Sequence, residues 1–179
     1  MCPPLPAAQR VLLRHPSSDD AAELLRLVNS SRRLHHPWVF PPADEKAVTS
    51  YIRNSASDRL LGFLVCLRES EEIVGVVNLS EIVYGNFLSA YLGFYGHAEH
   101  SGLGYMREGL HLVLRHAFRT LGLHRIEANV QPGNGRSLTL LQALGFKKEG
   151  YSPKYLKIGG RWRDHERWAI LAEEWRVRG

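Results

Sequence analysis

The most informative segment of the sequence is residues 90–106, which read Ala90-Tyr91-Leu92-Gly93-Phe94-Tyr95-Gly96-His97-Ala98-Glu99-His100-Ser101-Gly102-Leu103-Gly104-Tyr105-Met106. Its first part is mostly aromatic and aliphatic, which is typical of a strand. Apolar residues then recur with helical spacing, at Met106, Leu110, Val113, Leu114, Ala117, Phe118 and Leu121. The stretch therefore predicts a strand, a glycine-containing loop and a helix, in that order.

The loop between this strand and this helix has the features of an anion site. The first turn of a helix has unpaired N–H groups and about half a positive charge. Gly102 and Gly104 lack a Cβ, so a ligand can approach the backbone, and phosphates bind at such helix ends. The alternative is that the glycines only make a tight turn. A dinucleotide-binding motif would need glycine at Arg107, and no Walker A sequence is present.

Composition sets limits on the class of protein. A chain of 179 residues suits one domain, and 44% hydrophobic with 23% charged residues is ordinary for a globular protein. No segment is apolar enough to span a membrane, and the N-terminus lacks the apolar core of a secretory signal, so we expect a cytoplasmic protein without a membrane partner. The net charge is +5, but the basic residues are spread along the chain, which favours an anionic cofactor over nucleic acid.

The remaining segments of the sequence show either the hydrophobic alternation of a strand or the hydrophobic spacing of a helix. Strands are predicted at 9–15, 61–67, 73–79, 88–96, 124–130, 155–158 and 161–171. Helices are predicted at about 19–31, 44–57, 106–121 and 134–144, with a proline- and aromatic-rich ordered loop at 33–42. This order predicts an α/β domain with a mixed sheet and helices on both faces. We expect a single domain over residues 9–172, with flexible ends at 1–8 and 173–179.

Several short motifs occur together in one order. They are Ala90-Tyr91-Leu92-Gly93-Phe94, Gly102-Leu103-Gly104-Tyr105-Met106, Arg125-Ile126-Glu127-Ala128-Asn129-Val130-Gln131-Pro132 with Asn134 and Ser137, Leu144-Gly145-Phe146 with Glu149-Gly150, and Gly160-Arg161-Trp162-Arg163-Asp164-His165. With these motifs in this order, the chain resembles the GNAT acetyltransferases, and within them the RimJ/RimL type, which acetylates protein N-termini. The resemblance covers about residues 9–172.

The resemblance implies a mostly antiparallel central sheet in which the strands at 88–96 and 124–130 splay apart around acetyl-CoA. The cofactor's pyrophosphate would lie on the amides of His100, Ser101, Gly102, Leu103, Gly104 and Tyr105. Its pantetheine arm would pair with the backbone of Leu92 to Tyr95, Phe94 included. Asn134 would hydrogen-bond the same arm, with Ser137 nearby; the alternative is that Asn134 only caps a helix.

Two positions depart from the family pattern. Glu99 stands where Gln or Arg is usual, and its carboxylate would repel phosphates, so we expect it to point toward Arg107 or into solvent. Leu141 stands where many family members carry the tyrosine that protonates the leaving thiolate. No general acid therefore carries over; Ser137 is the nearest polar substitute, and water is an alternative.

The implied chemistry is direct attack of a neutral amine on the thioester in a ternary complex. An α-amine, with a pKa of about 7.7–8.0, needs little help from a base. A backbone N–H near Phe94 would stabilise the oxyanion. Glu127 and Glu81 are the candidate bases, acting through water, and Trp38 and Tyr84 would border the acceptor groove. The histidine pairs, His35 with His36 and His97 with His100, have no matching ligand set, so no metal site is expected.

The predicted function is acetyl transfer from acetyl-CoA to an amine, foremost a protein N-terminal α-amine of the ribosomal-protein alanine or serine type. The alternative acceptor is a small molecule or an aminoglycoside. A non-catalytic CoA-binding domain is a further alternative, because of Glu99 and Leu141. Charge alone would allow a nucleic-acid binder, but no direct nucleic-acid binding is expected. The protein is expected to be a monomer or a homodimer.

Overall fold

The structure is a computed structural model that describes residues 10–175. The predicted end at 1–8 lies outside the described residues, as do residues 176–179 of the other predicted end. Among the described residues, no helix has the length and apolar character needed to cross a membrane.

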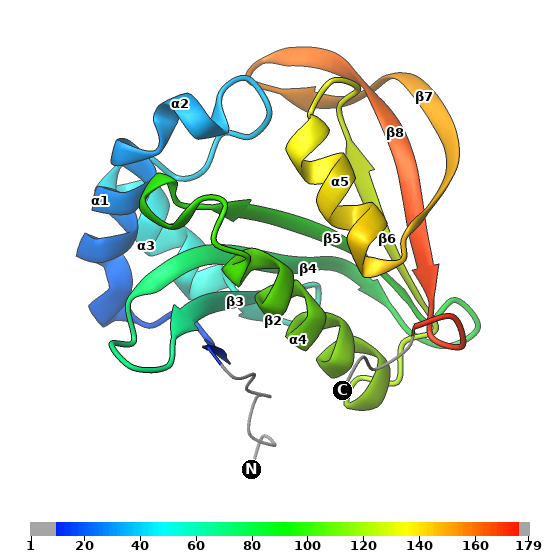
Figure 1. The fold of residues 1–179 in the computed structure, drawn as a ribbon, viewed down its shortest axis with the longest axis horizontal. Helices are drawn as coiled ribbons and strands as arrows, with labels where there is room; N and C mark the ends of the chain where they lie inside the picture. Colours follow the sequence, from blue (N-terminus) through cyan, green and yellow to red (C-terminus); the bar gives the residue numbers. More distant parts are fainter. Residues whose placement is uncertain (1–9, 176–179) are drawn as a thin grey trace.

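One twisted sheet forms the centre of the molecule (Figure 1). Its strands are β1 Val11–Arg14, β2 Ala56–Ser57, β3 Leu60–Leu67, β4 Ile73–Val83, β5 Ser89–Gly96, β6 Arg125–Val130, β7 Lys147–Ile158 and β8 Arg161–Leu171. The strand order is β1-β3-β4-β5-β6-β8-β7, with β2 also paired to β3. Only β5 and β6 pair in parallel within the described chain. The predicted mixed, mostly antiparallel sheet is thus confirmed.

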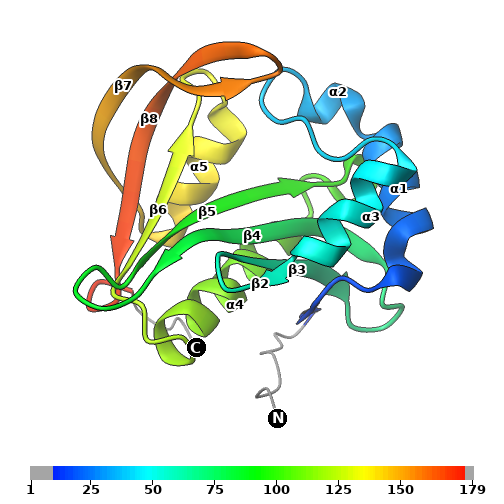
Figure 2. The same ribbon diagram turned by 180° about the vertical axis from the view of Figure 1, so that it is seen from behind.

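Helices cover both faces of this sheet, as predicted (Figures 1 and 2). They are α1 Ala21–Ser30, α2 Arg32–His35, α3 Glu45–Asn54, α4 Tyr105–Arg119 and α5 Gly135–Leu144. The larger core cluster lies under α4 and α5 and takes in residues of β1, β3, β4, β5, β6 and β8. The smaller cluster lies under α1 and α3 and takes in strand residues of β3, β4 and β5.

The central strands β5 and β6 pair over a short length and then separate. Their pairing ends at Tyr91 with Glu127, whereas β5 continues to pair with β4 as far as Gly96. Beyond that point β5 and β6 diverge (Figures 1 and 2). The predicted splay of the central strands is confirmed, and it leaves one edge of β5 without a neighbouring strand.

The structure also adds elements that the pattern did not predict. The segment predicted as a loop at 33–42 begins inside α2, and the short strand β2 follows α3. Strand β7 begins at Lys147 rather than at 155. The sequence pattern did not predict this earlier start, because two irregularities in the pairing of β7 with β8 break the two-residue alternation of side chains. Packing continues past the predicted boundary at 172, since Trp175 is buried and its ring lies 5.7 Å from that of Phe118.

Candidate active site

The free edge of β5 directs backbone groups into the gap between β5 and β6. The His97 N–H donates to the Val74 carbonyl at 3.1 Å, so His97 and Val74 are a hydrogen-bonded antiparallel pair. Because such pairs alternate along a strand, the N–H and C=O groups of Leu92 and Phe94 point away from β4 and toward the gap. The backbone of Tyr95 points toward β4.

The side chain of Tyr95 is also directed away from any cofactor on the α4 side. It is buried in the cluster under α1 and α3, where burial raises its pKa above the ordinary value. Of the four β5 residues from Leu92 to Tyr95 whose backbone was predicted to pair with the pantetheine arm, Leu92 and Phe94 therefore have the orientation required. Gly93 and Tyr95 do not, because their backbone groups point toward β4.

The loop that enters α4 presents a row of unpaired amides. Gly102 and Gly104 both have φ of +84°, a conformation that glycine adopts without strain. The N–H groups of His100 and Ser101 already donate to the carbonyls of His97 and Ala98, both at 3.2 Å. In residues 10–175, the N–H groups of residues 102–105 have no backbone acceptor. The set available for an anion therefore narrows to these four amides at the start of a long helix.

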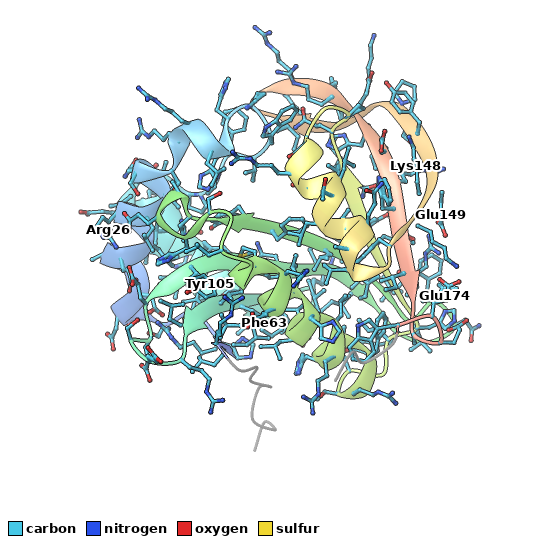
Figure 3. All side chains as sticks on the ribbon, viewed as in Figure 1. Arg26, Phe63, Tyr105, Lys148, Glu149 and Glu174 are labelled. Carbon is cyan, nitrogen blue, oxygen red and sulfur yellow. The ribbon has the colours of Figure 1, made fainter. Side chains whose placement is uncertain are left out.

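The space beside this loop is open to a ligand. A Cβ added at Gly102 would meet no atom within 4 Å, and Tyr105 lies at the first turn of α4 (Figure 3). A diphosphate fits this arrangement, because it needs amide donors, a positive helix end and free approach to the backbone. These residues thus fit the pyrophosphate of acetyl-CoA.

Arg10 holds the same loop from the β1 side. Its Nε donates to the Glu108 carboxylate at 2.7 Å, and its Nη1 donates to the Leu103 carbonyl at 3.2 Å. Its guanidinium also lies 4.8 Å from the centre of the Tyr105 ring. Sequence reasoning missed Arg10, because a single arginine ahead of an edge strand carries no local motif.

Glu99 is exposed to solvent, which is one of its two expected orientations. Its carboxylate accepts a hydrogen bond from Arg26 of α1 at 3.0 Å, rather than pairing with Arg107. The pairing with Arg26 reduces the repulsion that a free carboxylate would exert on a phosphate. Glu99 also brings a ligand atom within 4.8 Å of others on Glu72 and His100, but its own carboxylate is engaged by Arg26.

The start of α5 lies just beyond the end of β6. Asn134 is its N-cap residue, and Asn134 Oδ1 accepts a hydrogen bond from the Ser137 N–H at 3.4 Å. This is a long bond, so the cap is weak. Leu141 is fully buried in the core under α4 and α5, where no proton donor could replace it without loss of packing.

The segment after α2 crosses toward the open end of the gap. The Gln131 side-chain amide donates to the Trp38 carbonyl at 3.0 Å, and the Trp38 ring lies 3.6 Å from the position of a Cβ on Gly133. The Phe40 ring lies against Gly159 in the turn between β7 and β8. The structure therefore places Trp38 beside the end of β6, where an acceptor could reach it.

The two candidate bases lie in different places. Glu127 lies at the point where β5 and β6 part, and its carboxylate accepts a hydrogen bond from Arg125 at 2.7 Å. Glu81 pairs with Arg59 and lies in the irregular part of β4. Tyr84 follows β4 and is exposed beyond the paired end of the sheet, where Val83 is opposite Ser89. The structure thus brings Glu127, but neither Glu81 nor Tyr84, to the gap.

Comparisons with known proteins agree with this geometry. The sequence model of the acetyltransferase (GNAT) domain matches residues 10–147. The ribosomal protein uS5-alanine N-acetyltransferase of Escherichia coli is 45% identical over 107 residues, which are 60% of this chain and 55% of that protein.

Two solved structures share the fold. RimJ of Mycobacterium smegmatis, in complex with CoA-disulfide, is 34% identical with a TM-score of 0.82, covering 92% of this chain and 83% of that one. The spermidine N-acetyltransferase of Vibrio cholerae, in complex with CoA and spermine, is 25% identical with a TM-score of 0.78, covering 92% and 97%. The chain therefore belongs to the GNAT acetyltransferase family and is an acetyl-CoA-dependent N-acetyltransferase.

Proposed function

We propose that the acceptor of this enzyme is the α-amino group of a protein N-terminus, of the ribosomal-protein alanine or serine type. The similarity to the Escherichia coli enzyme, which is named for the alanine of ribosomal protein uS5, supports this acceptor. The structural similarity to a spermidine N-acetyltransferase makes a polyamine the competing acceptor.

The observation that carries the proposal is the pairing of the carboxylates around the gap. Arg125 donates to Glu127 at 2.7 Å and to Glu149 at 3.0 Å. A polyamine or an aminoglycoside carries several positive charges and is bound best by carboxylates without an internal partner. Here both carboxylates already have an arginine partner, which weakens their attraction for a polycation, and the chain has a net charge of +5. A single α-amine is the better match.

The chemistry required of the protein is also modest for an α-amine. Near pH 7 an amine with a pKa of about 7.7–8.0 is partly neutral, whereas a lysine with a pKa of about 10.4 is almost wholly charged. Glu127 is engaged by Arg125, so it accepts a proton only through water or after leaving this pair. The Phe94 N–H, directed into the gap, supplies a donor for the oxyanion.

The position of Glu99 also weakens one argument for the alternative that this chain is a non-catalytic CoA-binding domain. Glu99 was expected to hinder phosphate binding, but its pairing with Arg26 holds the carboxylate on the α1 side. The absence of a tyrosine at position 141 remains, and Ser137 at the start of α5 or water takes its place as proton donor in this proposal.

The test offers peptides with free and with blocked N-termini, each containing an internal lysine, together with spermidine. We expect acetyl-CoA-dependent acetylation of the free N-terminus, detected by mass spectrometry, with a rate that rises through about pH 7–8 and then levels off. Lysine acetylation in the blocked peptide at a matching rate would overturn the proposal. Rapid turnover of spermidine without turnover of either peptide would assign the enzyme to small amines.

A further inference from the structure

We propose that the side-chain amide oxygen of Asn129 receives the acceptor amino group by accepting one of its hydrogens. The proposal rests on the proposed function, because it takes the acceptor to be an α-amine that must be held in its neutral form. It assigns an acceptor contact to a residue type that carries no charge.

Asn129 lies in the part of β6 that has separated from β5. It lies two residues beyond Glu127, the last β6 residue paired with β5, and is opposite Arg167 of β8. One edge of the strand at Asn129 is therefore paired, while the other edge borders the gap. A group at this position can contact a substrate that lies between β5 and β6.

The side chain of Asn129 is directed to the face opposite the cofactor loop. Its neighbours Ala128 and Val130 are buried in the cluster under α4 and α5, and side chains alternate along a strand. The cluster under α1 and α3 contains no described residue of β6 or β8. The hydrophobic core under α1 and α3 therefore does not extend over this part of the sheet, on the side away from α4.

The amide oxygen of Asn129 also lacks a partner. Within residues 10–175, Oδ1 is screened from solvent and makes no hydrogen bond, although the residue as a whole is half-buried. Buried oxygens without a donor are rare, because the lost hydration is not replaced. Because Oδ1 is closed to solvent in this conformation, a donor supplied by the substrate accounts for it once a covering side chain moves aside as the acceptor binds.

The other oxygen groups on this face are engaged. Glu127 is bound by Arg125, and Tyr91 and Tyr155 share a hydrogen bond that raises the pKa of Tyr91 to about 12. His165 of β8 has a depressed pKa because of burial. With Arg167, these are the titratable groups that flank Asn129 from β5, β6, β7 and β8.

A neutral acceptor has a chemical advantage over a carboxylate here. A nearby negative charge stabilises the ammonium form of an amine and raises its pKa, which removes the nucleophilic lone pair. An amide oxygen accepts one N–H and leaves the lone pair free for the thioester carbon. Asn129 can therefore hold the amine without promoting its protonation.

The test compares Asn129→Leu and Asn129→Asp with the wild-type enzyme on a peptide with a free N-terminus. Asn129→Leu should raise the KM for peptide about tenfold, leave the KM for acetyl-CoA unchanged and leave the pH dependence of kcat unshifted. Asn129→Asp should keep the KM for peptide within about threefold but shift the rise of kcat by about one pH unit to the alkaline side. Asn54→Leu, on the exposed end of α3, is the matched control and should behave as wild type.

Each part of the result decides the proposal. Unchanged peptide KM and kcat in Asn129→Leu would overturn it, as would an unshifted pH profile in Asn129→Asp. CoA binding by calorimetry verifies that both variants are folded. If the wild-type enzyme acetylates spermidine and not the peptide, the proposed function fails, and the same variants measured on spermidine decide the role of Asn129 separately.

Discussion

Arg10 and Glu108, which lie ninety-eight residues apart in sequence, form an ion pair beside the cofactor loop. Glu108 lies in the first turn of α4, where its carboxylate is close to the amides that fit the pyrophosphate. Without Arg10, that carboxylate would compete with the phosphates for the positive end of the helix. The pair thus links the first strand of the sheet to cofactor binding.

The first prediction concerns this pair. Arg10→Ala should raise the KM for acetyl-CoA about three- to tenfold with little change in kcat, because it frees both Glu108 and the Leu103 carbonyl. Glu108→Gln in the Arg10→Ala background should recover part of the loss, since the repelling charge is removed. Initial rates at varied acetyl-CoA measure both effects. No recovery in the double variant would show that the charge of Glu108 is not the cause.

The second prediction concerns the loop glycines. Gly102→Ala should weaken CoA binding strongly in calorimetry, because its Cβ would occupy open space that the pyrophosphate needs. Gly104→Val should abolish binding while leaving a folded domain. The matched control is Gly122→Ala, which also has positive φ and open space around it but lies after α4, at the far end from the loop. Both alanine variants share the backbone strain of about 1–2 kcal/mol, so only a ligand effect separates them.

Local patterns in the sequence predict only part of this fold. The β5–loop–α4 unit could be predicted, because a strand-like apolar segment precedes Gly102 and Gly104 and apolar residues with helical spacing follow them. The start of β7 could not, since its irregular pairing hides the alternation that predicts a strand. The partner of Glu99 could not be predicted either, because Arg26 lies seventy-three residues away in sequence and meets Glu99 only through tertiary contact.

Tyr84 and Tyr95 show a second limit. Both are aromatic residues near the predicted site, yet one lies beyond the paired end of the sheet and the other faces the core under α1 and α3. Which face of β5 Tyr95 occupies depends on the register with β4, and a shift by one residue would exchange the two faces. Register is set by the whole sheet rather than by the motif.

The third prediction concerns acid stability and His97. Burial lowers the pKa of His97 to about 3, against about 6.5 in an unfolded chain. The folded pKa is depressed, so stability is full above about pH 6.5. It falls as the pH drops toward 3, because only the unfolded chain takes up the proton. His97→Gln should make the loss shallower by about 1 kcal/mol per pH unit between pH 6.5 and 4.5.

Urea unfolding at several pH values measures this slope. His35, His116 and His165 also have depressed pKa values because of burial, so the slope in His97→Gln should be reduced rather than abolished. An equal slope in His97→Gln and wild type would mean that His97 is protonated in the folded protein.

The last prediction separates the two roles of Asn134. As a helix cap, its Oδ1 accepts from the Ser137 N–H, and Asn134→Ala should cost at most about 1 kcal/mol in the free energy of unfolding. As a cofactor contact, its amide would orient the pantetheine arm at the open end of the gap. Asn134→Ser keeps a side chain that caps well but removes the amide. We therefore expect Asn134→Ser to retain the stability of the wild type and to lose about three- to tenfold in kcat/KM for acetyl-CoA, which is the loss of one hydrogen bond.

Thermal unfolding and initial rates on the same samples measure the two quantities. Full activity in Asn134→Ser together with lower stability in Asn134→Ala would leave Asn134 as a cap alone, and the amide contact would have to be supplied by another residue at the start of α5.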